Sequence, residues 1–445
     1  MQNQTLTESL AAFDPEIYAL LQEEIQKQRF TLSLLPTSNA VSPFSAYLKG
    51  SILGNGHLDH HAVQSHLKLE DIAAQRAEKL FGADHALVRV GDIASASRVV
   101  FQALATRGDT ILSFNRRKSE HCIGEHLWYD FVSFSIEPET ERIDLDRVAE
   151  LARARKPRLL IYSPVNYPLH IDYKKLREIA KSVGAYLWVD IGQNAGAVAA
   201  GCAPSPVPYA DVVTMPTGDS LHGPQSAVIF TRAELADNMD RAILDTGHSV
   251  VKKNVLAALA TTFYEADSES FKAYCQQVLS NAKALEAGLQ AAGVKTLCGS
   301  TQTHLVLACL PAGKDPEMMA KDLRESGFLV KGDNMLTSDE GRTFPILRLS
   351  ALDPTTRALK ETALKTVGHL LGEFILSGGS EAAKQKAQTQ IRAILMDKPL
   401  FSDEWLPQHI RLTPGYGKKD LNISREVEAE KQEAQAERMW SFWDN

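Results

Sequence analysis

A run of imidazole and carboxylate side chains lies near the N-terminus, in the sequence GHLDHHAVQSH of residues 56–66. Such groups can bind zinc, iron or nickel, and with shifted pKa values they can act as general acids and bases. The spacing fits no standard metal motif, and the alternative is a solvated histidine-rich loop. His57, His60 and His61 are therefore candidate metal ligands, without a definite metal site.

A second candidate segment is TMPTGDSLHGPQSAVIF, residues 214–230, in which two apolar runs flank a polar loop. The pattern predicts a strand, a short loop and a second strand. The loop carries Thr217, Asp219 and His222.

Apolar, β-rich runs alternate with amphipathic helical segments over much of the chain. Strands are expected at 109–114, 158–163, 186–191, 211–216 and 226–231. This alternation is typical of a mostly parallel sheet covered by helices on both faces. Helices are also expected at 8–30 and around 250–290, with irregular chain at 31–66.

The expected domains are an N-terminal helix and dimer or active-site arm, a large α/β domain, a smaller α+β domain, and a linker with a charged helix. Their predicted boundaries are 1–66, 67–290, 291–401 and 402–445.

Composition excludes several classes of protein. The 445 residues carry a net charge of −7, and the longest cationic cluster is RRK at 116–118, which does not suggest nucleic-acid binding. We find no apolar run of the ~20 residues that a membrane span needs, and no signal-peptide pattern at the N-terminus. The five cysteines form no CxxC pair. We expect a cytoplasmic protein with reduced thiols.

Four segments together resemble the serine hydroxymethyltransferase family: LLPTSNAVSP (34–43), RAEKLFGADHALV (76–88), the long run 179–230, and LRLSALDP (347–354). The resemblance covers about residues 10–400. It implies a fold-type I transferase that depends on pyridoxal phosphate (PLP), with a mostly parallel large domain and a smaller C-terminal α+β domain. It also implies a homodimer, because this family builds its pocket across the dimer interface.

Three residues match functional positions of the family. Asp190 lies where a carboxylate holds the pyridine nitrogen of PLP, His121 where a histidine stacks on the ring, and Arg348 where an arginine clamps the amino-acid carboxylate. Structural alternatives are a helix-cap aspartate, a surface histidine and a locally paired arginine. The expected pocket residues are Asp190, His121, Arg348, Gln193, Asp92 and Thr217.

Other positions depart from the family. Asp219 stands at the Schiff-base lysine, and Asp92 lies in the turn that would hold the phosphate. Gln193 replaces a ring-packing histidine, and residues 48–66 contain no glutamate for acid–base work. An aspartate offers no nucleophilic amine and repels a phosphate.

From these departures we expect no internal aldimine, no serine hydroxymethyltransferase activity and no cofactor, with PLP binding disfavoured. The expected protein is a repurposed family member with a pocket for a small amino-acid-like or carboxylate ligand. It could act as a PLP-independent enzyme, with Asp219, His121 and His222 as candidate catalytic residues.

Two alternatives remain open. One is a lysine-independent PLP enzyme that acts on an amino acid. The other is a non-catalytic scaffold or regulatory subunit that binds a protein partner through the tail 421–445, which contains Trp440, Phe442 and Trp443.

Overall fold

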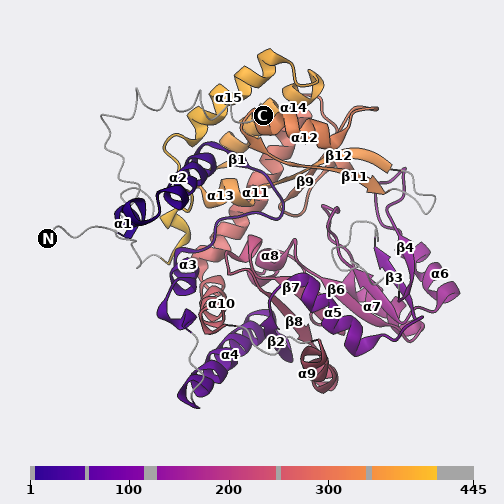
Figure 1. Ribbon diagram of the computed structural model, residues 1–445. Helices are drawn as coiled ribbons and strands as arrows, with labels where there is room; N and C mark the ends of the chain where they lie inside the picture. Colours follow the sequence, from indigo (N-terminus) through magenta and orange to yellow (C-terminus); the bar gives the residue numbers. More distant parts are fainter. Residues whose placement is uncertain (1–5, 56–59, 115–127, 247–251, 337–342, 408–445) are drawn as a thin grey trace.

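The computed structural model describes residues 6–55, 60–114, 128–246, 252–336 and 343–407. A large sheet and a smaller sheet lie in separate parts of the molecule, and helix α11 runs beside the smaller one (Figure 1). This mixed α/β architecture confirms the predicted fold class.

The large sheet has seven strands in the order β2-β8-β7-β6-β5-β3-β4. Strand β8 runs antiparallel to both of its neighbours, β2 and β7, and the other pairs are parallel. Every residue of β5 and β8 is buried, as expected for strands covered on both faces. The strands are β2 (His85–Val90), β3 (Thr110–Phe114), β4 (Asp130–Phe134), β5 (Leu159–Tyr162), β6 (Tyr186–Asp190), β7 (Val212–Pro216) and β8 (Ala227–Thr231).

Helices cover both faces of this sheet and create two hydrophobic clusters. One cluster contains apolar residues of α5 and α9, and the other contains residues of α4, α7, α10 and α11. The helices around this sheet are α4 (His60–Phe81), α5 (Ile93–Leu104), α6 (Leu145–Arg155), α7 (Tyr173–Ser182), α8 (Ala195–Ala199), α9 (Ala236–Asp245), α10 (Lys253–Ala266) and α11 (Glu269–Ala291).

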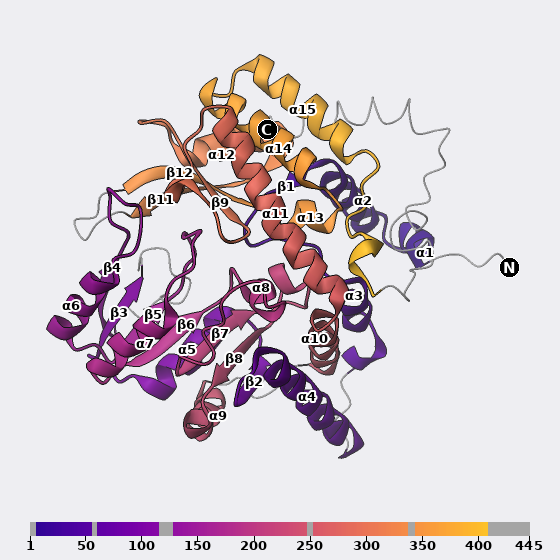
Figure 2. The ribbon, with the colours of Figure 1, turned by 180° about the vertical axis from the view of Figure 1, so that it is seen from behind.

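The smaller sheet has the antiparallel order β11-β12-β9. Helices α11 and α14 pack closely together beside it, and Figure 2 shows α11 running from this sheet toward α10. The elements of this part are β9 (Leu305–Cys309), β10 (Phe328–Leu329), β11 (Lys331–Leu336), β12 (Thr343–Ser350), α12 (Pro316–Glu325), α13 (Leu352–Thr356), α14 (Glu361–Leu376) and α15 (Glu381–Leu395).

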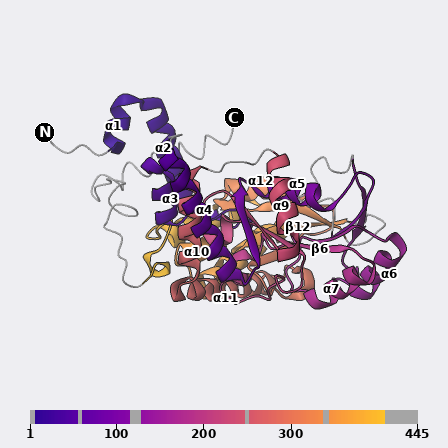
Figure 3. The same ribbon diagram turned by 90° about the horizontal axis from the view of Figure 1, so that it is seen from below.

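The N-terminal segment joins the two parts. It contains α1 (Leu6–Phe13), α2 (Pro15–Phe30), β1 (Leu32–Ser33) and α3 (Pro43–Lys49). Strand β1 pairs with β10, and the Ser350 amide donates to the Leu34 carbonyl at 2.8 Å. Helices α1 and α2 project at one end of the molecule, away from α6 and α7 (Figure 3).

Some predicted elements differ in their boundaries. The helix predicted at 8–30 is broken because Asp14 caps α2, with Oδ1 accepting from the Ile17 amide, and Pro15 begins that helix. The helix predicted around 250–290 is two helices, because Ser268 caps α11. Residues 31–66, predicted as irregular, include α3 and the start of α4.

The proposed domain boundaries stay predictions, and the tail 421–445 lies outside the described residues. Within the described part of the chain, no helix is both long and apolar enough to cross a membrane.

Candidate functional site

The carboxyl ends of β5, β6 and β7 bring candidate residues to one edge of the large sheet. These strands are parallel neighbours, so the segments that follow them emerge side by side. Asp190 ends β6, and Thr217 follows β7 directly. In open α/β sheets, ligands bind at this edge.

Asp190 is a buried carboxylate in a fixed orientation, with 6% of its surface exposed. Its Oδ2 accepts a hydrogen bond from Thr214 Oγ1 at 2.8 Å, and its Oδ1 accepts from the Gly192 amide at 3.0 Å. Trp188 Nε1 donates to the same Thr214 hydroxyl at 2.9 Å. These bonds hold the carboxylate in place at the sheet edge.

The loop after β7 is a closed turn. Thr217 Oγ1 donates to the Pro224 carbonyl at 2.7 Å, and the Gly223 amide donates to the Thr217 carbonyl at 2.9 Å. Asp219 begins a short 3₁₀ helix, η5 (Asp219–Leu221), in the left-handed region with φ of 38°. The turn therefore fixes the backbone from which the partly buried Asp219 side chain starts.

Two hydrogen bonds from other segments hold this turn in place. The Gly196 amide at the start of α8 donates to Ser220 Oγ at 3.0 Å, and Asn39 Nδ2 donates to the Asp219 carbonyl at 2.8 Å. A Cβ at Gly196 would lie 2.3 Å from the Ser220 carbonyl oxygen, so this close approach requires glycine.

Arg348 reaches the same edge from the smaller sheet. It lies on β12, is 7% exposed, and donates from Nη2 to the Val165 carbonyl at 3.0 Å. Val165 follows β5 of the large sheet. The guanidinium thus lies between the two sheets, with donors suited to a carboxylate.

Four further buried polar residues lie on segments next to this arginine, and sequence reasoning missed them: Asn166, Asp333, His304 and Ser350. Asn166 Nδ2 donates to Asp333 Oδ2 at 2.9 Å, which links the loop after β5 to β11. His304 Nδ1 and Ser350 Oγ are 2.9 Å apart. Burial lowers the pKa of His304 to about 4, and the positive charge of Arg348 acts in the same direction. His304 is therefore neutral at physiological pH.

His222 lies in the core rather than facing a ligand. Its ring packs against Phe271, Tyr274 and Phe401, and Nδ1 lies 2.8 Å from the Ala40 carbonyl oxygen. Burial lowers its pKa to about 4. This placement favours a structural role, in which His222 joins the Asp219 turn to the N-terminal segment.

The remaining candidates are more dispersed. Asp92 is exposed and caps α5, and Gln193 is partly buried after β6. His121 and His57 lie outside the described residues, and of the side chains of His60 and His61 nothing is described beyond their place at the start of α4. Among the described residues, no group of three or more His, Cys, Asp or Glu side chains could hold a metal ion.

A cavity of about 390 Å³ lies elsewhere, between residues 138–142 and 290–299. Its Glu141 already pairs with Lys295 and accepts from the Cys298 amide at 2.7 Å. Because its carboxylate is occupied by these contacts, we place the candidate site at the sheet edge, where Asp190 and Arg348 are buried.

The family model and the relatives that match this chain all point to the same family. The family model for serine hydroxymethyltransferase matches residues 10–371. The serine hydroxymethyltransferase of Rippkaea orientalis is 33% identical over 414 residues, which cover 88% of this chain and 96% of the relative. That of Myxococcus xanthus is 33% identical over 409 residues, covering 88% and 98%. That of Crocosphaera subtropica is 34% identical over 412 residues.

These matches correct one expectation. The matched family is PLP-dependent, so membership points to PLP as the cofactor, and the expectation of no cofactor is wrong.

The residues at the candidate site suit one end of the PLP molecule, its pyridine ring. The buried carboxylate of Asp190 suits a protonated pyridine nitrogen. At the N-terminus of α5, however, Asp92 Oδ1 accepts from the Ser95 amide at 2.7 Å, an N–H that a phosphate there would need. The turn after β7 carries Asp219, and residues 214–230 contain no lysine. The ring end of the cofactor therefore fits, whereas a phosphate beside Asp92 and a covalent bond at position 219 do not.

Proposed function

The chain belongs to the serine hydroxymethyltransferase family, and from that premise we propose that it is a divergent member whose site binds a small amino-acid-like or carboxylate ligand without a covalent bond between the protein and PLP. The observation that carries this proposal is the buried guanidinium of Arg348, held between the two sheets by the Val165 carbonyl. A buried cation at the ligand-binding edge of an α/β sheet favours an anionic ligand group.

The second support is a second buried charged residue, Asp190, at the same edge as Arg348. Asp190 suits the ring of PLP, which when bound supplies an electron sink for an amino acid. Asp190 would hold the ring nitrogen, and Arg348 would orient the ligand carboxylate. We assign no proton transfer to His222, because its ring is enclosed by aromatic side chains.

The proposal that the protein forms no covalent bond with PLP rests on Asp219. The closed turn from Thr217 to Gly223 fixes the backbone at this position, and a carboxylate there cannot attack the aldehyde of PLP as an amine does. Loss of the family's transferase activity is part of the same proposal.

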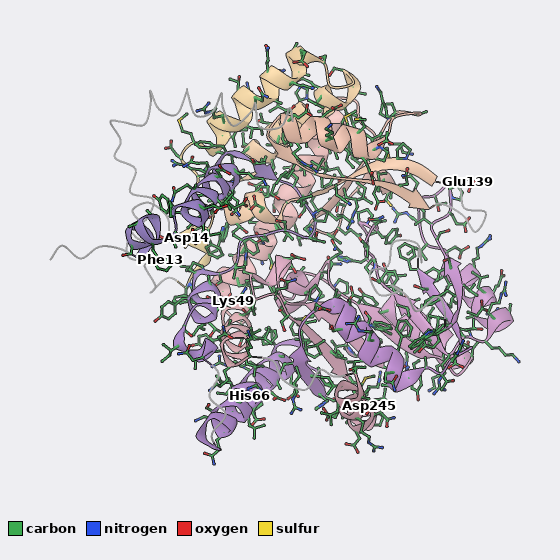
Figure 4. All side chains as sticks on the ribbon, viewed as in Figure 1. Phe13, Asp14, Lys49, His66, Glu139 and Asp245 are labelled. Atoms are coloured by element: carbon green, nitrogen blue, oxygen red, sulfur yellow. The ribbon has the colours of Figure 1, made fainter. Side chains whose placement is uncertain are left out.

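A homodimer is also part of the proposal. Large apolar side chains are exposed on the N-terminal helices and their neighbours, and Phe13 lies at the outer edge of α1 (Figure 4). Such a surface is typical of a protein–protein interface. The exposed residues include Phe13, Ile17, Leu20, Tyr47, Ile52, Leu67 and Tyr264.

Titration calorimetry with glycine tests the ligand site, in the presence and absence of PLP. We expect Arg348→Lys to weaken glycine binding by roughly tenfold or more, because lysine loses the planar two-donor contact with a carboxylate. Arg153→Lys, an exposed change on α6, is the matched control and should bind as the wild type does. Equal affinity of the Arg348→Lys variant and the wild type, or no glycine binding by the wild type, would overturn the proposal.

A further inference from the structure

Asn166 and Asp333 form a buried polar pair near Arg348. The proposed function gives neither residue a role. Asn166 is 1% exposed and Asp333 is 7% exposed. Burying polar groups this deeply costs free energy unless they are hydrogen-bonded. Each hydrogen bond that these side chains form or lack therefore needs an explanation.

Like the arginine, the pair joins the loop after β5 to the smaller sheet. Arg348 Nη2 donates to the Val165 carbonyl, and the next residue, Asn166, donates through Nδ2 to Asp333 Oδ2 at 2.9 Å. In the β11–β12 ladder, Lys331 is paired with Arg348 and Asp333 with Ile346.

The ladder therefore places the acid close to the base. Because side chains alternate along a strand, Asp333 and Arg348 project from the same face of the sheet. They are diagonal neighbours, a relation that sets Cα atoms about 7–8 Å apart. The carboxylate of Asp333 and the guanidinium of Arg348 thus start from neighbouring positions on one face of the smaller sheet.

One acceptor of the pair is unused. The other Asp333 oxygen, Oδ1, accepts from the Asn334 amide at 2.7 Å. The Asn166 Oδ1 atom, by contrast, is buried and accepts no hydrogen bond within the described part of the chain. An amide oxygen next to a carboxylate is a place for an N–H donor or an ammonium group.

We propose that Asn166 and Asp333 are specificity-determining residues that receive the ammonium group of a zwitterionic amino acid, while Arg348 receives its carboxylate. This inference rests on the proposed function, since it needs the carboxylate at Arg348. The Asp333 carboxylate disfavours ligands with a second anionic group and selects against carboxylates that lack the amine.

The test is a pair of ligands that differ only in the amine. Binding of L-serine and of 3-hydroxypropanoate to the full-length protein is measured by titration calorimetry, with succinate as the dianionic probe. We expect the wild type to bind L-serine at least roughly tenfold more tightly than 3-hydroxypropanoate, since a charge-assisted hydrogen bond is lost with the amine.

Asp333→Asn is the decisive variant, because it keeps the shape of the side chain and removes the charge. Its preference for L-serine should fall by roughly tenfold, and its affinity for succinate should rise. Asn166→Ala should lower the same preference. Asp397→Asn, an exposed change after α15, is the matched control and should keep the wild-type ratio. Thermal unfolding of each variant identifies those that fold.

The outcomes separate this inference from the proposed function. If the wild type binds both ligands equally, or if Asp333→Asn keeps the wild-type ratio, the inference is wrong and the carboxylate site stands. If neither ligand binds and Arg348→Lys changes nothing, the proposed function fails and the inference fails with it.

Discussion

At the scale of single residues, burial decides which side chains are charged, and Glu265 is the clearest case. It lies on α10, is partly buried, and accepts a hydrogen bond from Ser42 Oγ at 2.8 Å. Burial raises its pKa from 4.5 to about 7, although the Ser42 hydroxyl acts in the opposite direction. The folded protein therefore binds this proton more tightly than the unfolded chain does.

This shift predicts a pH dependence of stability. Between about pH 4.5 and about pH 7 the unfolded chain releases the proton while the folded protein keeps it, so the free energy of unfolding falls as the pH rises. Compared with Glu265→Gln, the wild type should be similarly stable below about pH 4.5 and less stable by up to about 3 kcal/mol at about pH 8. Urea unfolding across this range measures the difference. Glu234→Gln is the exposed control, and a gap for Glu265→Gln that does not vary with pH would contradict the assignment.

At the scale of elements, the contact between α8 and the turn that begins at Thr217 fixes Asp219. We predict that Gly196→Ala destabilises the protein by about 1–3 kcal/mol, because the new Cβ would lie 2.3 Å from the Ser220 carbonyl oxygen, a backbone atom that cannot rotate away. The matched control is Gly50→Ala, whose Cβ would find its nearest atoms at 3.8 Å. Urea unfolding should show a lower free energy of unfolding for Gly196→Ala and little change for Gly50→Ala. Equal stabilities of the two variants would show that α8 does not pack tightly against this turn.

How far the sequence predicts these elements depends on their composition. The runs 158–163 and 226–231 are apolar at every position except their two ends, as fully buried strands are, so β5 and β8 were predictable. Strands β2 and β4 were missed because their sequences, HALVRV and DFVSF, mix polar residues with apolar ones. The caps at Asp14 and Ser268 divided two predicted helices, since local hydrogen bonding to a cap overrides a continuous helical pattern.

The residues at the candidate site also differ in whether the sequence predicts them. Asp190 and Arg348 were predicted from the family resemblance, and the structure places both at the edge between the sheets. Asn166 and Asp333 could not be predicted, because their hydrogen bond joins residues 167 positions apart, and no local pattern marks either one. His222 was a catalytic candidate by sequence, and only its aromatic surroundings indicate a structural role.

At the scale of the whole molecule, the exposed apolar side chains of the N-terminal half predict self-association. Tyr47 and Ile52 are 72% and 83% exposed. We expect the wild type to sediment as a dimer and Tyr47→Asp with Ile52→Asp to sediment as a monomer at the same concentration, since two charges would be buried without partners. Leu376→Asp at the end of α14 is the control, because its side chain is 52% exposed far along the chain from these helices. A wild type that sediments as a monomer, or a double variant that remains dimeric, would contradict this interface.

The most direct test of the whole account is borohydride reduction of the protein after incubation with PLP, followed by peptide mass spectrometry. Reduction converts a Schiff base between PLP and a lysine into a stable pyridoxyl adduct. We predict no stoichiometric adduct on any lysine of the wild type, and an adduct at position 219 in Asp219→Lys, because position 219 lies in the turn after β7, the strand next to β6, which ends at Asp190. A stoichiometric pyridoxyl-lysine in the wild type would contradict the central claim, because a lysine elsewhere in the chain would then hold the cofactor covalently.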